Sequence, residues 1–178
     1  MLRSKEIINY YNPRVWFIEN PQTGMLKDRD FMVGLPFTDL DYCCYCDWGY
    51  KKRTRLWNNI EFEGDRCPGK DACPNMEGNK HKSTAQQGKN TCKDGLYGNT
   101  FAEQGWEVVS LDSDEKTDAT IHEDILTWDY TVYPPGHFDM NWASPCCTHY
   151  SCARRNAKTP RNLSLAESLV LRSREIIY

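Results

Sequence analysis

The sequence predicts one domain of the α/β class, with a parallel or mixed sheet at its centre. Its 178 residues are enough for one hydrophobic core and little more. Short apolar stretches that are typical of strands alternate with stretches of helical periodicity. Polar residues follow several of these strands, and in α/β sheets functional groups gather at the carboxyl ends of strands.

Each element is predicted from its own local pattern. An amphipathic helix begins near Ser164, a residue type that caps helices, and continues to the end of the sequence. Apolar and β-branched stretches predict strands at residues 15–18, 41–46, 54–58, 106–112, 119–125 and 137–143. A short helical segment is expected near residues 28–33. Helices are expected to cover both faces of the resulting sheet.

The composition excludes several classes of protein. Hydrophobic residues make up 39% of the chain and charged residues 26%, as in soluble globular proteins. No apolar stretch is long enough to cross a membrane, and the first residues lack the apolar core of a signal peptide. We therefore expect an intracellular protein, in the cytoplasm or nucleus. Its nine cysteines are then thiols, metal ligands or a nucleophile rather than disulfides.

The two ends of the chain carry nearly the same heptapeptide. Residues 2–8 and 171–177 are identical at six of seven positions, and the seventh exchanges Lys5 for Arg174. This repeat predicts a circular permutation by tandem duplication, with both ends inside one helix. One groove is expected for that helix, and the N-terminal copy, which leads into the strand at 15–18, is its expected occupant. The displaced copy would favour a homodimer formed by helix exchange.

Two short motifs carry the predicted chemistry. Residues 145–147 read Pro-Cys-Cys after one predicted strand, and residues 19–21 read Glu-Asn-Pro after another. A cysteine thiolate is a strong nucleophile toward an electron-poor ring carbon, and a nearby carboxyl group can hold a ring nitrogen in its protonated form. Arg53 and Arg55 complete this set of residues.

With these motifs the sequence resembles the DNA cytosine-5 methyltransferases, in particular their small virus- and phage-type members. The resemblance rests on the Pro-Cys region at 142–151, Phe-Ile-Glu-Asn-Pro at 17–21 and Lys-Arg-Thr-Arg-Leu-Trp at 52–57. The family order is rotated, because residues 1–88 match its C-terminal half and residues 89–178 its N-terminal half. The resemblance implies a single Rossmann-like, S-adenosylmethionine-dependent methyltransferase domain that is circularly permuted.

The resemblance also implies a mechanism for methylating cytosine in DNA. Cys147 takes the cysteine position of the family's Pro-Pro-Cys motif, as the nucleophile that adds to carbon 6 of a flipped cytosine. Cys146 directly follows the proline and stays an alternative nucleophile. Glu19 would protonate or hydrogen-bond ring nitrogen 3, and Arg53 and Arg55 would anchor the base. RNA stays open as a substrate.

The cofactor region departs from the family pattern. The resemblance assigns to S-adenosylmethionine binding Gly95, Gly98, Asp112, Asp124, Ile125 and Pro145. Lys93 replaces the first glycine of the family motif and no apolar strand precedes it, so a degenerate first strand is expected. Two alternatives follow: an inactive nucleic-acid-binding relative that has lost cofactor binding, and a fragment that is active only when two chains complement each other.

A group of cysteines lies in the first half of the chain. Four zinc ligands could come from Cys43, Cys44, Cys46, Cys67, Cys73 and His81. Residues 43–46 have the spacing of a ligand pair, whereas Cys67 and Cys73 are loosely spaced. The sequence therefore favours ordinary reduced thiols over a metal site.

Overall fold

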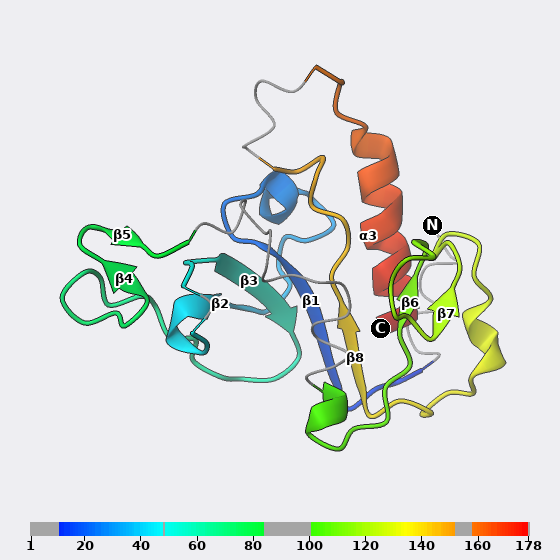
Figure 1. Ribbon diagram of the computed structural model, residues 1–178. Coiled ribbons are helices and arrows are strands. Elements are labelled where there is room, and N and C mark those ends of the chain that lie inside the picture. Colours follow the sequence, from blue (N-terminus) through cyan, green and yellow to red (C-terminus); the bar gives the residue numbers. More distant parts are fainter. Residues whose placement is uncertain (1–10, 48, 84–100, 152–157, 178) are drawn as a thin grey trace.

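The computed structural model describes residues 11–47, 49–83, 101–151 and 158–177 (Figure 1). Its strands are β1 (Val15–Pro21), β2 (Phe37–Asp41), β3 (Arg53–Asn58), β4 (Met76–Glu77), β5 (Lys80–His81), β6 (Leu111–Asp112), β7 (Ile121–His122) and β8 (Met140–Ala143). Its helices include α3 (Leu163–Ile177) and 3₁₀ helices at Met25–Asp28, Tyr42–Cys44 and Tyr130–Val132. No helix among the described residues combines the length and apolar character that a membrane span requires.

A four-stranded mixed sheet lies at the centre, with the strand order β2-β3-β1-β8. β1 pairs with β3 in antiparallel register and with β8 in parallel register. β2 extends the antiparallel side, whereas β4–β5 and β6–β7 form two small separate sheets. The prediction of a mixed sheet is confirmed, and the Rossmann-like fold and the circular permutation stay predictions.

Alternation along β1 and β3 directs one set of side chains toward α3. Ile18 and Trp57 form a cross-strand pair and are almost fully buried, together with Ala166 and Val170 of α3. Figure 1 shows α3 running alongside the sheet. Burial of apolar surface contributes roughly 25 cal/mol per Å², so this shared apolar cluster stabilises the packing of the helix on the sheet.

The opposite face of the sheet has its own apolar cluster. The buried members are Leu40, Tyr42, Tyr50 and Leu56. Tyr42 and Tyr50 lie between β2 and β3, so among the described residues this connection, rather than an α-helix, contributes to the cluster. The N–H of Tyr42 donates to Lys52 O at 3.1 Å, which closes this connection.

The predicted strands beside the cavity described below are shorter than expected. The stretches 106–112 and 119–125 contribute only β6 and β7. The N–H groups of Ser110 and Thr120 bond each other's hydroxyls at 3.0–3.2 Å, while Ser110 O still accepts a backbone bond from Ile121 N at 2.9 Å. The stretch 137–143 is likewise shortened, to β8.

Two further predictions are wrong because the chain turns where a regular element was expected. The stretch 41–46 is not a strand: β2 ends at Asp41, and the N–H groups of Tyr45 and Cys46 bond Tyr42 O in a 3₁₀ turn. The helical segment at 28–33 is replaced by the 3₁₀ helix Met25–Asp28 and the turns that follow it.

Helix α3 differs from the prediction at its N-terminal end. Its N-terminal cap is Asn162 rather than Ser164, because Asn162 Oδ1 accepts a hydrogen bond from the N–H of Leu165 at 3.0 Å. The C-terminal heptapeptide continues this helix without a break, as the sequence predicts. Arg172, within this heptapeptide, donates hydrogen bonds to the carbonyl oxygens of Ile125 and Trp128 and so holds the helix against that segment. Residues 2–8 lie outside the described residues, and the homodimer stays a prediction.

Candidate active site

The Pro-Cys and Glu-Asn-Pro motifs lie side by side at the carboxyl ends of two parallel strands. β1 and β8 pair in register, and Glu19 and Ser144 are the neighbours just beyond the last pair. Ser144 Oγ donates to Glu19 Oε2 at 2.5 Å, and Asn20 Nδ2 donates to Pro145 O at 3.1 Å. These bonds tie the two segments together, as expected of strand ends in an α/β sheet.

Glu19 is a buried carboxylate, only 3% exposed. Its Oε1 lies 3.1 Å from Lys52 Nζ, and its Oε2 accepts the bond from Ser144. Strand alternation explains the contact with Lys52, because Glu19 lies opposite Leu56 and Lys52 precedes Leu56 by an even number of residues. Both carboxylate oxygens are engaged, which fixes the orientation of the group.

The two cysteines of the Pro-Cys motif have different surroundings. Cys146 is exposed, and its Sγ donates to Thr148 Oγ1 at 3.2 Å. Burial raises the pKa of the Cys147 thiol above its ordinary value, the charges of Cys146 and Glu19 raise it further, and the charge of Lys52 lowers it. Cys147 therefore shares its electrostatic surroundings with Glu19.

The chain after Cys147 is held by hydrogen bonds rather than by a regular element. The N–H of Tyr150, a fully buried residue, bonds Cys147 O at 3.0 Å. Arg161 donates to His149 O at 2.9 Å and to Ser151 O at 3.0 Å. The loop that carries the two thiols is thus fixed on both sides, by Asn20 before it and by Arg161 after it.

The two arginines of β3 do not join Glu19 in the described structure. Arg55 makes a bidentate bond to Asp39, at 2.7 and 2.8 Å, and its guanidinium lies 3.6 Å from the centre of the Phe37 ring. Burial alone would raise the pKa of Asp39, but the bond to Arg55 and the arginine's charge lower it below its ordinary value. The Arg53 side chain is 55% exposed. The register places both arginines on the face of the sheet opposite Glu19.

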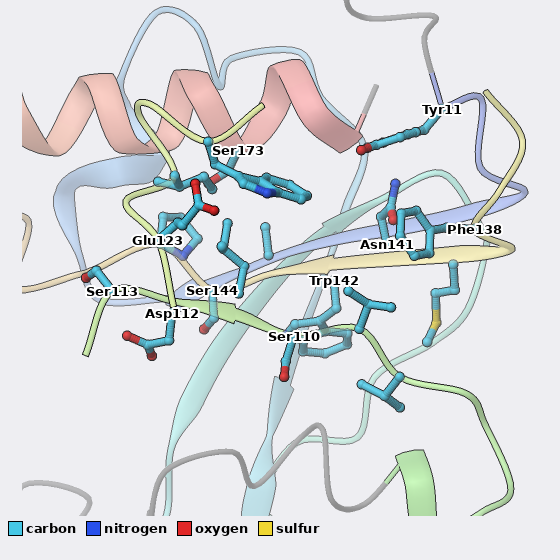
Figure 2. Close-up of a pocket in the computed structure, with 18 of the residues that line it drawn as sticks. Tyr11, Ser110, Asp112, Ser113, Glu123, Phe138, Asn141, Trp142, Ser144 and Ser173 are labelled. Atoms are coloured by element: carbon cyan, nitrogen blue, oxygen red, sulfur yellow. The ribbon is translucent and has the colours of Figure 1, made fainter. Parts of the chain in front are cut away.

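A cavity of about 590 Å³ is lined by residues of both β6 and β8 and reaches the Pro-Cys loop. Volumes of this order hold cofactor-sized ligands. Figure 2 shows the carboxylates of Asp112 and Glu123 toward one end of the cavity and the rings of Tyr11 and Phe138 toward the other. The cavity therefore offers hydrogen-bond acceptors and apolar surface at separate places.

Most of the residues assigned to the cofactor line this one cavity. They are Asp112, Asp124, Ile125 and Pro145, and Cys146 lies beside them. Asp124 Oδ1 accepts a bond from Leu126 N at 2.9 Å, which shapes the turn that carries Ile125. Gly95 and Gly98 lie outside the described residues.

The predicted metal-ligand candidates are only partly brought together. Cys43, Cys67, Cys73 and His81 form one group. Cys46 does not join it, although its spacing from Cys43 is that of a ligand pair, and its Sγ donates to Tyr42 O at 3.1 Å. Cys44 is also outside the group.

Sequence reasoning missed three residues of the site. Lys52 lies within a basic cluster just before β3. The alternation of residues 54 and 56 in β3, continued back to residue 52, is a signal that would have placed it on the face of Glu19. Ser144 and Asn20 belong to the two motifs, yet their bonds depend on the pairing of distant strands. No local pattern reports that pairing.

The contact of Lys52 with Glu19 predicts a pH effect on Cys147. In Lys52→Met the positive charge that lowers the Cys147 pKa is lost, so the pKa rises and the thiolate fraction at neutral pH falls. We expect alkylation of Cys147 by iodoacetamide to slow by roughly threefold or more at pH 7, where one pKa unit corresponds to tenfold. The rate is measured against pH in a Cys146→Ser background.

Lys52→Arg is the matched control and should keep the pH profile, because it keeps the charge. An unchanged profile in Lys52→Met would show that Lys52 does not act on the thiol.

Comparison with known proteins identifies a viral relative. A 78-residue segment of this chain is 50% identical to a protein of Frog virus 3 (isolate Goorha) named "Probable DNA (cytosine-5)-methyltransferase". The alignment covers 43% of this chain and 36% of the viral protein. No protein-family model and no solved structure matches the chain. The match confirms the resemblance to virus-type DNA cytosine-5 methyltransferases that the motifs indicate.

Proposed function

We propose that this protein transfers a methyl group from S-adenosylmethionine to carbon 5 of cytosine in DNA through a covalent cysteine adduct. One observation carries the proposal: the parallel strands β1 and β8 bring the Glu19 and Cys147 motifs side by side, next to a cavity of cofactor size. Methylation of a flipped cytosine needs three groups close to the base: a nucleophile, a group that donates a hydrogen bond or a proton to ring nitrogen 3, and a methyl donor. The name of the viral relative supports DNA as the substrate.

Cys147 supplies the nucleophile in this proposal. Its thiolate adds to carbon 6 of the extruded cytosine, which makes carbon 5 electron-rich and able to accept the methyl group. A base such as water then takes the carbon 5 proton, the electron pair of that C–H bond re-forms the double bond between carbons 5 and 6, and Cys147 leaves as the thiolate. Lys52 favours the thiolate, because its charge lowers the Cys147 pKa.

Glu19 supplies the contact to ring nitrogen 3. Ser144 and Lys52 hold its buried carboxyl group in place beside the loop of Cys147. Hydrogen bonding or proton transfer at nitrogen 3 offsets the negative charge that develops on the ring when the thiolate adds. Asn20 positions the Pro-Cys loop through its bond to Pro145.

The cavity fits S-adenosylmethionine in size and in chemistry. Asp112 and Glu123 offer carboxylates for hydroxyl and amino groups, and Ile125 offers apolar surface for a purine ring. When bound, this cofactor supplies an electrophilic methyl group. Pro145 lines the cavity and also accepts the bond from Asn20, so one loop joins the cofactor site to the base site.

The strand arrangement supports the Rossmann-like fold that belongs to this proposal. β6 and β7 are parallel, β8 and β1 are parallel, and β3 and β2 follow in antiparallel order. The cavity is lined from both sides by β6 and β8. The family's central first strand, which the sequence indicates to be degenerate before Gly95, would belong between them. The rotated motif order supports the circular permutation.

Calorimetric titration with S-adenosylmethionine tests the proposal against the inactive nucleic-acid-binding alternative. We expect the wild-type protein to bind S-adenosylmethionine and Asp112→Asn to bind it roughly tenfold more weakly. The reason is that loss of one charge-assisted hydrogen bond costs about 1.4 kcal/mol, which corresponds to a tenfold change in the dissociation constant. Asp114→Asn is the matched control, because Asp114 is an exposed neighbour that does not line the cavity.

Transfer of a labelled methyl group to duplex DNA, with RNA of the same sequence beside it, then identifies the nucleic acid. DNA binding without any cofactor binding would favour the inactive relative instead.

A further inference from the structure

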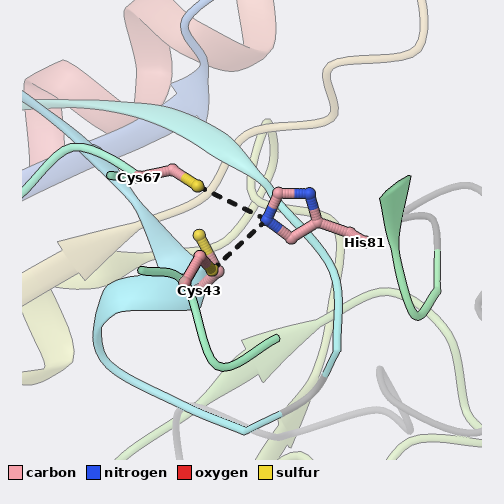
Figure 3. A group of neighbouring side chains, drawn as sticks. Cys43, Cys67 and His81 are labelled. Atoms are coloured by element: carbon pink, nitrogen blue, oxygen red, sulfur yellow. Dashed lines mark hydrogen bonds between the residues drawn. The ribbon is translucent and has the colours of Figure 1, made fainter. Parts of the chain in front are cut away.

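We propose that Cys43, Cys67, Cys73 and His81 form a structural zinc site. Their four ligand atoms lie within 4.8 Å of one another. Figure 3 shows the side chains of Cys43, Cys67 and His81 converging from separate segments of the chain. One ligand lies in the 3₁₀ turn after β2, two lie at the ends of the turn 67–73, and the fourth lies in β5.

The spacing of these atoms matches tetrahedral zinc. His81 Nε2 lies 3.5 Å from Cys67 Sγ and 3.6 Å from Cys73 Sγ. With Zn–S near 2.3 Å and Zn–N near 2.0–2.1 Å, tetrahedral geometry puts sulfur and nitrogen about 3.5 Å apart. Three thiolates and one imidazole fill all four positions, which is typical of structural rather than catalytic zinc.

Buried hydrogen bonds hold the ligand-bearing segments in place. Asn75, 3% exposed, donates from Nδ2 to Cys43 O at 2.9 Å and accepts at Oδ1 from Gly49 N at 3.1 Å. Asp41 Oδ2 accepts from Cys67 N at 2.9 Å. Contacts of this kind orient metal ligands, and here they fix the backbone of two of the four.

The segment 61–83 buries too few apolar side chains to stabilise its own packing against the sheet. Apart from Cys73 and Asn75, each of its residues is at least partly exposed. β4 and β5 have only two residues each, and Figure 1 shows them projecting on the side of the sheet away from α3. Small segments without a core commonly depend on a bound metal, and metal binding then becomes folding energy.

The proposed zinc site is connected to the candidate active site by the chain between Cys43 and Cys67. The chain between Cys43 and Cys67 includes Lys52, which contacts Glu19, and Tyr42 N bonds Lys52 O next to the first ligand. Zinc at this position would hold the loop from which Lys52 extends. Lys51, whose charge acts on Cys67 and His81, would offset the net charge of −1 of a zinc ion with three thiolates.

Metal analysis of the full-length protein, purified without chelator, tests this inference. We expect about one zinc ion per chain, as one tetrahedral site requires. Replacement by cobalt should give the visible bands of tetrahedral, thiolate-bound Co²⁺. Cys67→Ser and Cys73→Ser should each lose most of the zinc, whereas Cys46→Ser, a neighbouring cysteine outside the group, should retain it.

Alkylation of the wild-type thiols tests the site without any variant that might fail to fold. We expect Cys43, Cys67 and Cys73 to be protected until a chelator is added, and exposed Cys146 to react equally with and without it. A protein that contains no zinc, binds no cobalt and shows chelator-independent alkylation of Cys43, Cys67 and Cys73 would overturn the proposal.

Discussion

DNA containing 5-fluorocytosine is expected to become covalently attached to Cys147 when S-adenosylmethionine is present. Fluorine at carbon 5 cannot leave as a proton does, so the adduct with carbon 6 cannot resolve after methyl transfer. Cys147→Ser should reduce trapping to background, because a serine hydroxyl is a far weaker nucleophile than a thiolate. A pool of duplexes of varied sequence is used, and the adduct is measured by its shift in a denaturing gel and by mass spectrometry of the attached peptide.

Cys146→Ser is the matched control for this experiment. Cys146 is exposed and lines the cavity, whereas the electrostatic surroundings of Cys147 include both Glu19 and Lys52. The variant should therefore still form the adduct. If Cys147→Ser traps DNA and Cys146→Ser does not, the nucleophile is Cys146 and the family register is shifted by one residue in this chain.

The local sequence pattern was sufficient to predict the strands whose alternating apolar residues are buried in the core. β1 and β3 were predictable because alternating residues such as Ile18 and Trp57 fill the core beside α3. The stretch that contains β6 is shorter than predicted, and just before β6 and β7 the N–H groups of Ser110 and Thr120 bond side-chain hydroxyls instead of backbone carbonyls. Propensity scales describe side chains one at a time and carry no information about such exchanges.

The candidate site was predictable to the extent that it follows strand ends. Glu19 and the Pro-Cys loop meet because β1 and β8 run parallel. The Pro-Cys motif follows its strand as predicted, whereas residues 19–21 are the last residues of β1 and do not follow it. The metal group was not predictable from spacing, because Cys67, Cys73 and His81 approach Cys43 only after residues 61–83 fold back on the sheet. Spacing favoured Cys46 instead, whose thiol caps a turn.

Glu19→Gln is expected to reduce methyl transfer by roughly 10²-fold or more while leaving DNA binding nearly unchanged, which is the usual scale for an acid–base group. The amide keeps the size of the side chain, but it cannot exchange a proton with ring nitrogen 3. Turnover with saturating cofactor and the dissociation constant for DNA are measured separately, so that chemistry and binding are resolved.

Glu167→Gln is the matched control for Glu19→Gln, because Glu167 also pairs with a cation, Arg29, but lies in α3. Loss of that ion pair should change stability slightly and turnover little, since exposed and half-exposed ion pairs contribute about 0–1 kcal/mol. A fall in turnover confined to Glu19→Gln assigns the effect to the proton on nitrogen 3. Equal losses of DNA binding and turnover in Glu19→Gln would instead make Glu19 a structural residue that holds Lys52 and Ser144 in place.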